Sequence, residues 1–367
     1  MRVSTYEVKL MSCFLASYPL AGVLVCISSP RHKNLLVIGV SLFYLIGLFD
    51  LWSGLRTLVI SSAGAYTIAK YIPGSAMPWI GFVFLMAHLS ISHVTRVPGT
   101  QGMSIIGAQM VTVIKLSSFC WNVHDGRQPD AELSQRQRQR VISTLPPLLE
   151  YAGYVLFFPS LFVGPAFDFA EYQRWLTRHQ SMGSRQLLTA ARKAAYGLLW
   201  TIAFYKVSRL YSPWILLSYE AMQRSILKRV WHMYVLGLST RMRYYGFWNL
   251  VEGACIVSGI SFNGVDLQTG HARWDGMENA KPLKLEFAQA ADVYVRNWNI
   301  HTHLWLRDYV YLRCPYPASK KHPGFLARTI SFIVSALWHG FNPGHYLSFI
   351  AAAVIQTIAK GNIIRLP

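Results

Sequence analysis

Thr329-Ile-Ser-Phe-Ile-Val-Ser-Ala-Leu-Trp-His-Gly-Phe-Asn-Pro-Gly344 begins the longest stretch of this sequence without Lys, Arg, Asp or Glu, which follows Arg328 and continues to Ala359. About 20 mostly apolar residues suffice to cross the hydrocarbon core of a bilayer. The stretch is divided at His339-Gly-Phe-Asn-Pro-Gly344, because proline and glycine break a helix. It therefore predicts a membrane-embedded helical segment that is interrupted next to a histidine.

The composition extends this interpretation to the whole chain. Of its 367 residues, 53% are hydrophobic and 14% are charged, with a mean hydropathy of +0.27, whereas soluble domains carry roughly 25% charged residues. The formal net charge of +19 fits basic loops that orient membrane helices and face anionic lipid. We expect a protein that crosses the lipid bilayer several times and binds no nucleic acid, because no hydrophilic domain is available for that task.

Further charge-poor windows occur along the chain at residues 10–29, 35–49, 55–69, 79–95, 105–121, 194–217, 230–238 and 244–262. Residues 145–167 are apolar but are broken by prolines and glycines, and residues 171–193 are basic and amphipathic, as in an interfacial helix. The polar loop 123–147 is too charged for the bilayer. We predict an all-α polytopic membrane protein of about ten membrane segments plus re-entrant or interfacial helices, forming a single membrane-embedded domain over residues 1–367.

His339 is the first candidate for chemistry, because it lies at the break in the uncharged stretch. An ionisable side chain within a membrane segment is a functional signal, and a neutral imidazole can accept a proton at neutral pH. A core histidine that is hydrogen-bonded to backbone or water explains the position equally well.

Asn299 is the second candidate, within Arg296-Asn-Trp-Asn-Ile-His-Thr-His-Leu-Trp-Leu-Arg-Asp-Tyr-Val-Tyr311. On a helix, Asn299 and His303 would share a stripe beside an aromatic face made of Trp298, Thr302, Trp305 and Tyr309. An asparagine amide can donate hydrogen bonds to a developing negative charge. Such a stripe is nevertheless more often involved in packing than in catalysis.

Nucleotide-binding loops of the Walker or dinucleotide type and the serine-hydrolase elbow have no match in this sequence. The close histidine pair His301 and His303 is too small a cluster to indicate a membrane metal centre. We expect no metal and no permanently bound cofactor.

Four segments carry a recognisable pattern: Phe158-Pro-Ser-Leu-Phe-Val-Gly-Pro-Ala-Phe-Asp-Phe-Ala-Glu-Tyr172, Arg243-Tyr-Tyr-Gly-Phe-Trp248 with Ser258-Gly-Ile-Ser-Phe-Asn-Gly264, Trp298-Asn-Ile-His-Thr-His-Leu-Trp-Leu-Arg307, and Ser335-Ala-Leu-Trp-His-Gly-Phe-Asn-Pro-Gly344. Together and in this order, they resemble the membrane-bound O-acyltransferase family, in particular its lysophospholipid acyltransferase branch of the fungal broad-specificity type.

The resemblance implies an enzyme of the endoplasmic reticulum membrane, in which a helical bundle surrounds a tunnel for acyl-CoA and a lipid acceptor. The family's catalytic asparagine, in a W-N-x-x-T segment, and its histidine, in a W-H-G segment, match Asn299 and His339. Sterol and diacylglycerol branches carry an F-Y-x-D-W-W-N pattern, which Tyr294-Val-Arg-Asn-Trp-Asn299 lacks. This difference favours the lysophospholipid branch.

The implied reaction uses acyl-CoA as a co-substrate. His339 would act as general base toward the free hydroxyl of a lysophospholipid, and Asn299 would orient a reacting group or stabilise the oxyanion. Other residues expected near the substrates or coenzyme A are Arg307, Trp298, Trp305, Trp248, Glu252 and Asn263. Glu252 also has a structural interpretation, in which it pairs with Arg243 or Arg296. The basic cluster 136–140 could attract the phosphates of coenzyme A, but it is better explained as a signal that orients the protein in the membrane.

Two departures from the family pattern stand out. His345 occupies a position where this branch usually has tyrosine, and relatives continue through further membrane helices, so that we expect the family's C-terminal helices to be missing. The alternatives are an acyltransferase for a protein or glycerol acceptor, an inactive truncated remnant, or a lipid transporter or scramblase, since transport proteins also combine broken helices with midplane polar residues. The sequence makes no prediction of the oligomeric state.

Overall fold

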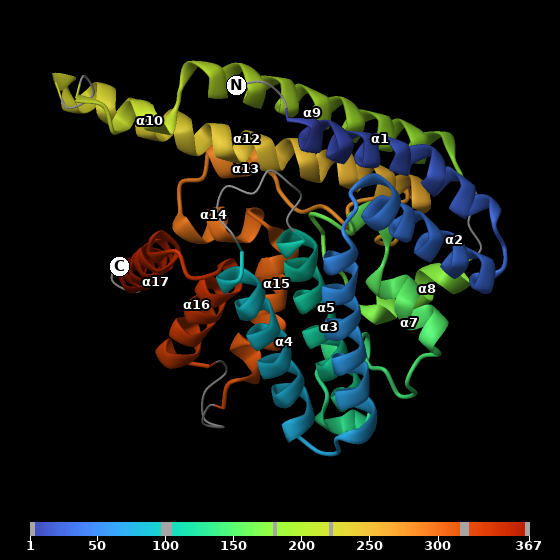
Figure 1. Ribbon diagram of the computed structural model, residues 1–367. Coiled ribbons are helices and arrows are strands. Elements are labelled where there is room, and N and C mark those ends of the chain that lie inside the picture. Colours follow the sequence, from blue (N-terminus) through green and yellow to red (C-terminus); the bar gives the residue numbers. More distant parts are fainter. Residues whose placement is uncertain (1–3, 97–104, 179–181, 220–222, 316–322, 364–367) are drawn as a thin grey trace. The chain divides into compact units, whose positions relative to one another are not determined.

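The computed structural model describes residues 4–96, 105–178, 182–219, 223–315 and 323–363 (Figure 1). The chain divides into two compact units, which are Met1–Cys26 with Gln180–Ala280, and Ile27–His179 with Lys281–Pro367. Within the described ranges, β-type pairing is limited to an isolated bridge between Val265 and Ala272. This confirms the predicted all-α class.

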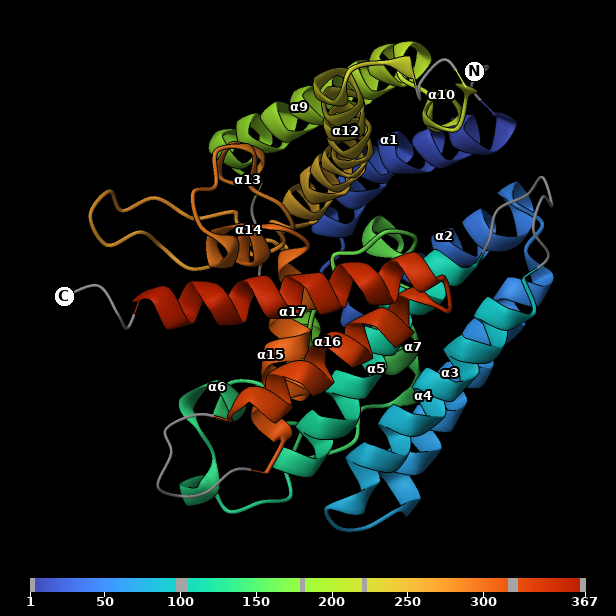
Figure 2. The same cartoon turned by 90° about the vertical axis from the view of Figure 1, so that its left-hand side faces the viewer.

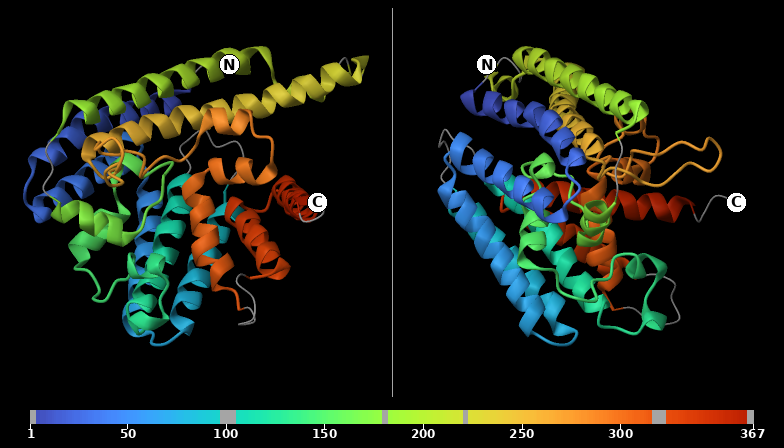
Figure 3. Two further views of the ribbon diagram at one scale, coloured as in Figure 1. Left: turned by 180° about the vertical axis from the view of Figure 1, so that it is seen from behind. Right: turned by 90° about the vertical axis from the view of Figure 1, so that its right-hand side faces the viewer.

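The first unit is built from long helices that pack closely. Its elements are α1 (Thr5–Cys26), α9 (Ser184–Leu210), α10 (Pro213–Leu216) and α12 (Ile226–Ser258). Helices α9 and α12 lie side by side over much of their length (Figures 1 and 3). A Cβ atom at Gly197 would lie 2.9 Å from the backbone nitrogen of Leu250 and 3.0 Å from the carbonyl oxygen of Gly246. Glycine at this crossing therefore lets the two backbones approach closely.

The second unit is organised around α5. Its elements are α2 (Pro30–Leu42), η1 (Phe43–Leu48), α3 (Trp52–Tyr71), α4 (Ala76–Val94), α5 (Ile106–Asp125), η2 (Asp130–Glu132), α6 (Gln135–Arg138), α7 (Leu148–Val155), η3 (Phe158–Ser160), α8 (Phe169–Thr177), α13 (Pro282–Glu286), α14 (Ala291–Asn297), α15 (Ile300–Tyr309), η4 (Tyr311–Arg313), α16 (Phe325–His339) and α17 (Pro343–Ile363). Every residue of α5 from Thr112 to Val123 is buried. Because burial extends around the whole circumference, α5 is the central helix of this unit, and α3, α4 and α15 all contact it (Figure 2).

Two of the described helices, α1 and α4, are long and apolar enough to cross a membrane by length and hydropathy. Helix α16 is apolar but has 15 residues. The uncharged stretch is divided where expected, since α16 ends at His339 and α17 begins at Pro343. The count of about ten membrane segments stays a prediction.

The predicted interfacial helix over residues 171–193 is wrong. Helix α8 ends at Thr177, and α9 begins only at Ser184, in the other unit. The backbone of Arg178 (φ −72°, ψ 128°) and that of Gly183 (φ −90°, ψ 153°) are extended. The continuous amphipathic pattern therefore spans two separate helices.

The predicted division between residues 230–238 and 244–262 is also wrong, because the first window and the second as far as Ser258 belong to the 33-residue helix α12. Polar residues between Ser239 and Arg243 lower the local hydropathy, but backbone hydrogen bonding does not depend on hydropathy. The helix ends at Ser258 and is capped by Gly259, whose φ of +83° is readily adopted only by glycine.

The broken segment 145–167 was predicted correctly, and a buried lysine stabilises the break. Helix α7 ends at Val155, where the Lys115 ammonium of α5 donates hydrogen bonds to the carbonyl oxygens of Tyr154 and Val155. The same ammonium lies 4.4 Å from the ring centroids of Tyr154 and Phe167. A cation at the C-terminal end of a helix, over aromatic faces, is stabilised electrostatically.

Candidate active site

His339 and Asn299 belong to two neighbouring helices of the second unit. His339 is the last residue of α16, and Asn299 directly precedes α15. The two helices contact each other (Figure 2), and their tryptophans Trp305 and Trp338 have ring centroids 6.1 Å apart. The structure thus brings together the two sequence segments that contain the predicted catalytic pair.

Both tryptophans are fixed to α5. The indole nitrogen of Trp305 donates a hydrogen bond to the Ser117 hydroxyl at 2.9 Å, and that of Trp338 donates to the Met110 carbonyl oxygen at 3.0 Å. Both side chains are buried. A buried indole usually needs a partner for its N–H group, so these bonds hold the segments of Asn299 and His339 to one common helix.

Asn299 has an unusual backbone conformation. Its φ of 44° and ψ of 57° lie in the left-handed region, which asparagine tolerates better than most other residues. The hydroxyl of Thr302 donates a hydrogen bond to Oδ1 of Asn299 at 2.9 Å. This contact fixes the side chain, with the amide oxygen directed toward the start of α15.

His339 lies among aromatic side chains at the end of α16. Its ring centroid is 4.7 Å from that of Trp338, 5.4 Å from that of Phe349 and 5.4 Å from that of His345. The half-buried imidazole is therefore flanked by both α16 and α17. His345 is therefore one of the residues that line its surroundings.

The predicted aromatic face of α15 is confirmed for three of its four members. Thr302, Trp305 and Tyr309 are buried on one side of the helix. Trp298 instead lies outside α15, since it follows α14 and has an extended backbone (φ −107°, ψ 128°). The bend at Asn299 takes Trp298 out of the helical register, which the sequence pattern did not reveal.

Arg307 lies in an ion-pair network near the C-terminal end of α15. Its guanidinium contacts the carboxylate of Asp308 at 2.6 and 2.9 Å, and Arg140 contacts the same carboxylate at 2.9 Å. Burial alone would raise the pKa of Asp308, but the hydrogen bonds and charges of these two arginines outweigh it and lower the pKa below its usual range. Arg140 also contacts Asp168 at 3.0 Å, so the network reaches the start of α8.

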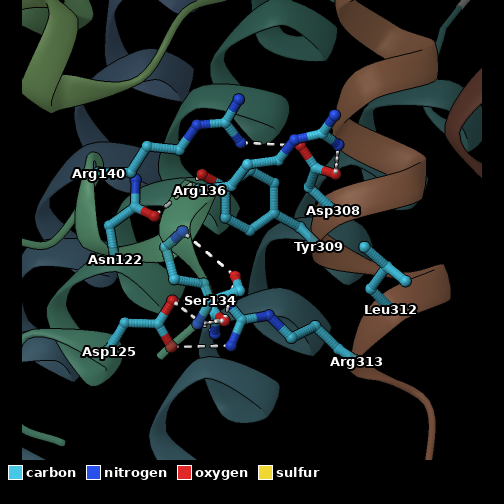
Figure 4. A pocket seen from close by; sticks show the side chains of 10 residues that line it. Asn122, Asp125, Ser134, Arg136, Arg140, Asp308, Tyr309, Leu312 and Arg313 are labelled. Carbon is cyan, nitrogen blue, oxygen red and sulfur yellow. Dashed lines mark hydrogen bonds and ion pairs between the residues drawn. The ribbon is translucent and has the colours of Figure 1, made fainter. Parts of the chain in front are cut away.

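A basic pocket of about 130 Å³ lies beside this network (Figure 4). It is lined by Asn122, Asp125, Ser134, Arg136, Gln137, Arg140, Asp308, Tyr309, Leu312 and Arg313. Arg313 is paired with Asp125, whereas Arg136 is 60% exposed and approaches Asp308 only to 3.8 Å. Arg136 is therefore the guanidinium of this pocket that is best able to turn toward an anion.

Trp248, Glu252 and Asn263 belong to the first unit, where they have structural partners. Trp248 is buried, with its ring centroid 5.3 Å from that of Tyr244. The exposed Asn263 donates a side-chain hydrogen bond to Asp275 at 2.9 Å. Within the first unit, Trp248 therefore contributes to helix packing, and Asn263 stabilises a loop.

Glu252 does not pair with Arg243 or Arg296, and that expectation is wrong. Its carboxylate lies 2.8 Å from the Lys193 ammonium of α9, and it accepts a hydrogen bond from the backbone N–H of Asn279 at 2.6 Å. Lys193 also contacts Glu278 at 3.1 Å. Arg296 is paired with Asp292 on its own helix. Hydropathy analysis could not identify Lys193 as the partner, because it is 59 positions away in sequence.

Comparison with known proteins identifies the family of this chain. The sequence profile of the membrane-bound O-acyltransferase family matches residues 2–364. The chain belongs to this family. It is therefore an acyltransferase of the membrane-bound O-acyltransferase type, and the resemblance seen in the sequence is confirmed.

Individual relatives narrow the comparison within the membrane-bound O-acyltransferases. The chain is 40% identical over 366 residues to a lysophospholipid acyltransferase of Schizosaccharomyces pombe, covering 96% of the chain and 71% of the relative. It is 32% identical over 388 residues to a lysophospholipid acyltransferase of Saccharomyces cerevisiae, covering 98% of the chain and 62% of the relative. It is 28% identical over 358 residues to membrane-bound glycerophospholipid O-acyltransferase 1 of Mus musculus, covering 91% of the chain and 70% of the relative. The chain thus spans 62–71% of the length of these three relatives.

Proposed function

We propose that this membrane-bound O-acyltransferase transfers a fatty acyl group from acyl-CoA to the free hydroxyl of a lysophospholipid, in the membrane of the endoplasmic reticulum. The observation that carries the proposal is the attachment of the Asn299 and His339 segments to α5 through Trp305 and Trp338. Helix α5 thereby keeps the segments of the proposed proton acceptor, His339, and of the proposed amide donor, Asn299, next to each other, and such positioning favours acyl transfer. The names of the relatives supply the acceptor class.

In the proposed reaction, His339 removes the proton of the acceptor hydroxyl, and the oxygen attacks the thioester carbonyl carbon of acyl-CoA. The carbon–sulfur bond then breaks, and the coenzyme A thiolate leaves and takes up the proton from His339. No covalent acyl-enzyme is needed. A positioned general base contributes roughly 10²–10⁴-fold to such a step.

Asn299 is proposed to stabilise the oxyanion of the tetrahedral intermediate. Its Oδ1 accepts the hydrogen bond from Thr302, so the Nδ2 amide is the end of the side chain that can donate to negative charge. One such donor contributes about 10²–10³-fold.

The basic pocket is proposed to bind a phosphate of coenzyme A, with Arg136 as its adaptable cation. A charged hydrogen bond is worth about 1.5–3 kcal/mol, and the exposure of Arg136 reduces that value. Arg136→Ala should raise the KM for acyl-CoA about 3–10-fold at unchanged kcat, whereas Arg138→Ala, an exposed neighbour on α6, should not. An unchanged KM in both variants would mean that the basic cluster serves only as an orientation signal.

The function is tested with labelled oleoyl-CoA and a panel of lysophospholipids, in membranes that contain the wild-type chain, His339→Ala or His32→Ala. The exposed His32 of α2 provides the matched control. We expect transfer to lysophospholipid in the wild type and the control, and loss of at least two orders of magnitude in His339→Ala. Transfer to a peptide or glycerol instead, or lipid flipping without transfer, would refute the proposal.

A further inference from the structure

His93 of α4 contacts the backbone on both sides of His339. Its Nε2 lies 3.2 Å from the carbonyl oxygen of Trp338. Because a carbonyl oxygen can only accept, this contact requires the proton of His93 to be on Nε2. Helix α4 therefore supplies a hydrogen-bond donor to the last turn of α16, where carbonyl groups lack partners within the helix.

The other side of the His93 ring packs against Gly340. A Cβ atom at position 340 would lie 2.8 Å from Nδ1, 3.0 Å from Cγ and 3.1 Å from Cε1 of His93. Gly340 also has a φ of +103°, which L side chains rarely adopt. Glycine is thus required here for two reasons, one steric and one conformational, and His93 is the source of the steric one.

Trp338 is consequently fixed at two points. Its indole nitrogen donates to the Met110 carbonyl oxygen of α5, and its own carbonyl oxygen accepts from His93 of α4. With the preceding residue fixed and Gly340 packed against the imidazole of His93, the backbone of His339 has little freedom. The position of the His339 ring then depends mainly on its own side-chain torsions.

We propose that His93 is a positioning residue for His339, acting as a hydrogen-bond donor to the Trp338 carbonyl group and not as a proton carrier. This inference rests on the proposed function of His339 as general base. A displacement of about 1 Å at a catalytic group can reduce the rate by 10²-fold. Loss of the donor should therefore lower kcat and leave substrate binding almost unchanged.

Three substitutions separate the donor from the other properties of the ring. His93→Leu removes the donor, His93→Gln can place an amide nitrogen where Nε2 lies, and the shorter His93→Asn cannot reach that position. We expect kcat for acyl transfer to fall about 10–100-fold in His93→Leu and His93→Asn, with the KM for acyl-CoA changed less than about twofold. His93→Gln should retain most of the activity.

His88→Leu is the matched control, because His88 lies on the same helix and contacts Ser61 of α3 at 2.9 Å. The kcat of His88→Leu should differ from that of the wild type by less than about threefold at equal protein level. Equal loss in His93→Gln and His93→Leu would overturn the proposal in favour of proton transfer. A wild-type rate in His93→Leu, or a raised KM with normal kcat, would also overturn it. If His93→Leu does not accumulate, the comparison of His93→Asn with His93→Gln decides.

A measurement that does not depend on acyl-transfer activity tests this inference separately from the proposed function. In a Cys26→Ser background, Phe341→Cys places a thiol at a residue that is 49% exposed, next to Gly340. Its maleimide labelling rate should rise several-fold with His93→Leu and remain at the starting value with His93→Gln. An unchanged rate in both would refute the positioning role, even if the wild-type chain transferred no acyl group.

Discussion

Removing Lys193 should destabilise the chain more than removing any exposed lysine of the same helix. Lys193 Nζ lies 2.8 Å from the Glu252 carboxylate and 3.1 Å from that of Glu278. The Glu252 side chain is 3% exposed, whereas those of Lys193 and Glu278 are 21% and 22% exposed. Lys193→Met would therefore leave a deeply buried carboxylate without its cation.

The size of the effect follows from these distances. At an effective dielectric constant of about 20, an ion pair at 2.8 Å is attractive by roughly 6 kcal/mol, part of which offsets desolvation. Breaking a buried pair typically costs about 3–5 kcal/mol. Because two of the three groups retain some solvent contact, we expect about 3 kcal/mol, or roughly 4 °C in Tm for a chain of this length.

The double variant Lys193→Met with Glu252→Gln tests the reasoning. Glutamine keeps an acceptor for the backbone N–H of Asn279 but has no charge to compensate, so at least half of the lost stability should return. Thermal unfolding is followed by fluorescence-detected size-exclusion chromatography of detergent-solubilised protein. Lys206→Met, at an exposed position of α9, should shift Tm by less than about 2 °C. A similar small shift in Lys193→Met, or no recovery in the double variant, would refute the ion-pair argument.

Three further predictions concern the second unit. Asn299→Asp keeps both the tolerance of left-handed backbone and the acceptor for Thr302, so we expect the acyl-transfer rate to fall about 10²–10³-fold with Tm unchanged; activity within tenfold of wild type would contradict the oxyanion role. Gly340→Ala should lower kcat at least about tenfold, because its Cβ would lie 2.8 Å from Nδ1 of His93; this is measured at matched protein level, and a wild-type rate would exclude the close packing. Because the pKa of Asp308 is lowered in the folded state, its charged form stabilises the fold at any pH above the ordinary aspartate pKa of about 4, and this stability is lost as the pH falls through the lower pKa of the folded state. The Tm of the wild type should therefore fall more steeply below pH 4 than the Tm of Asp308→Asn. Parallel curves of Tm against pH would contradict the pKa shift.

The sequence predicted those parts of the fold and site that depend on local pattern. The break between His339 and Gly344 was predicted because proline and glycine act locally, and it lies between α16 and α17. The family of the chain was predicted from four short segments and is confirmed over residues 2–364. The roles of His339 and Asn299 remain predictions that the mutants above can test.

Other features depend on tertiary contacts and left no readable signal. His93 lies in the apolar window 79–95, where the sequence analysis singled out no side chain, and its importance follows only from the approach of α4 to the end of α16. Lys193 seemed part of an interfacial segment, yet it is the cation for Glu252. Hydropathy windows also divided α12 at polar residues that remain helical. The error at Glu252 arose because a polar residue was interpreted from its sequence neighbours, whereas its partner Lys193 lies far away along the chain.

The attachment of both tryptophans to α5 has a consequence for how the protein tolerates different lipids. Bilayers of different thickness tilt and shift the helices embedded in them. Met110 and Ser117, which accept the two indole hydrogen bonds, are seven residues apart on one helix, or about 10 Å along its axis. Tilting of α5 would carry the two attachment points together and preserve the distance between them. Acyl transfer should therefore be less sensitive to membrane thickness than it would be if each segment were attached to a different helix.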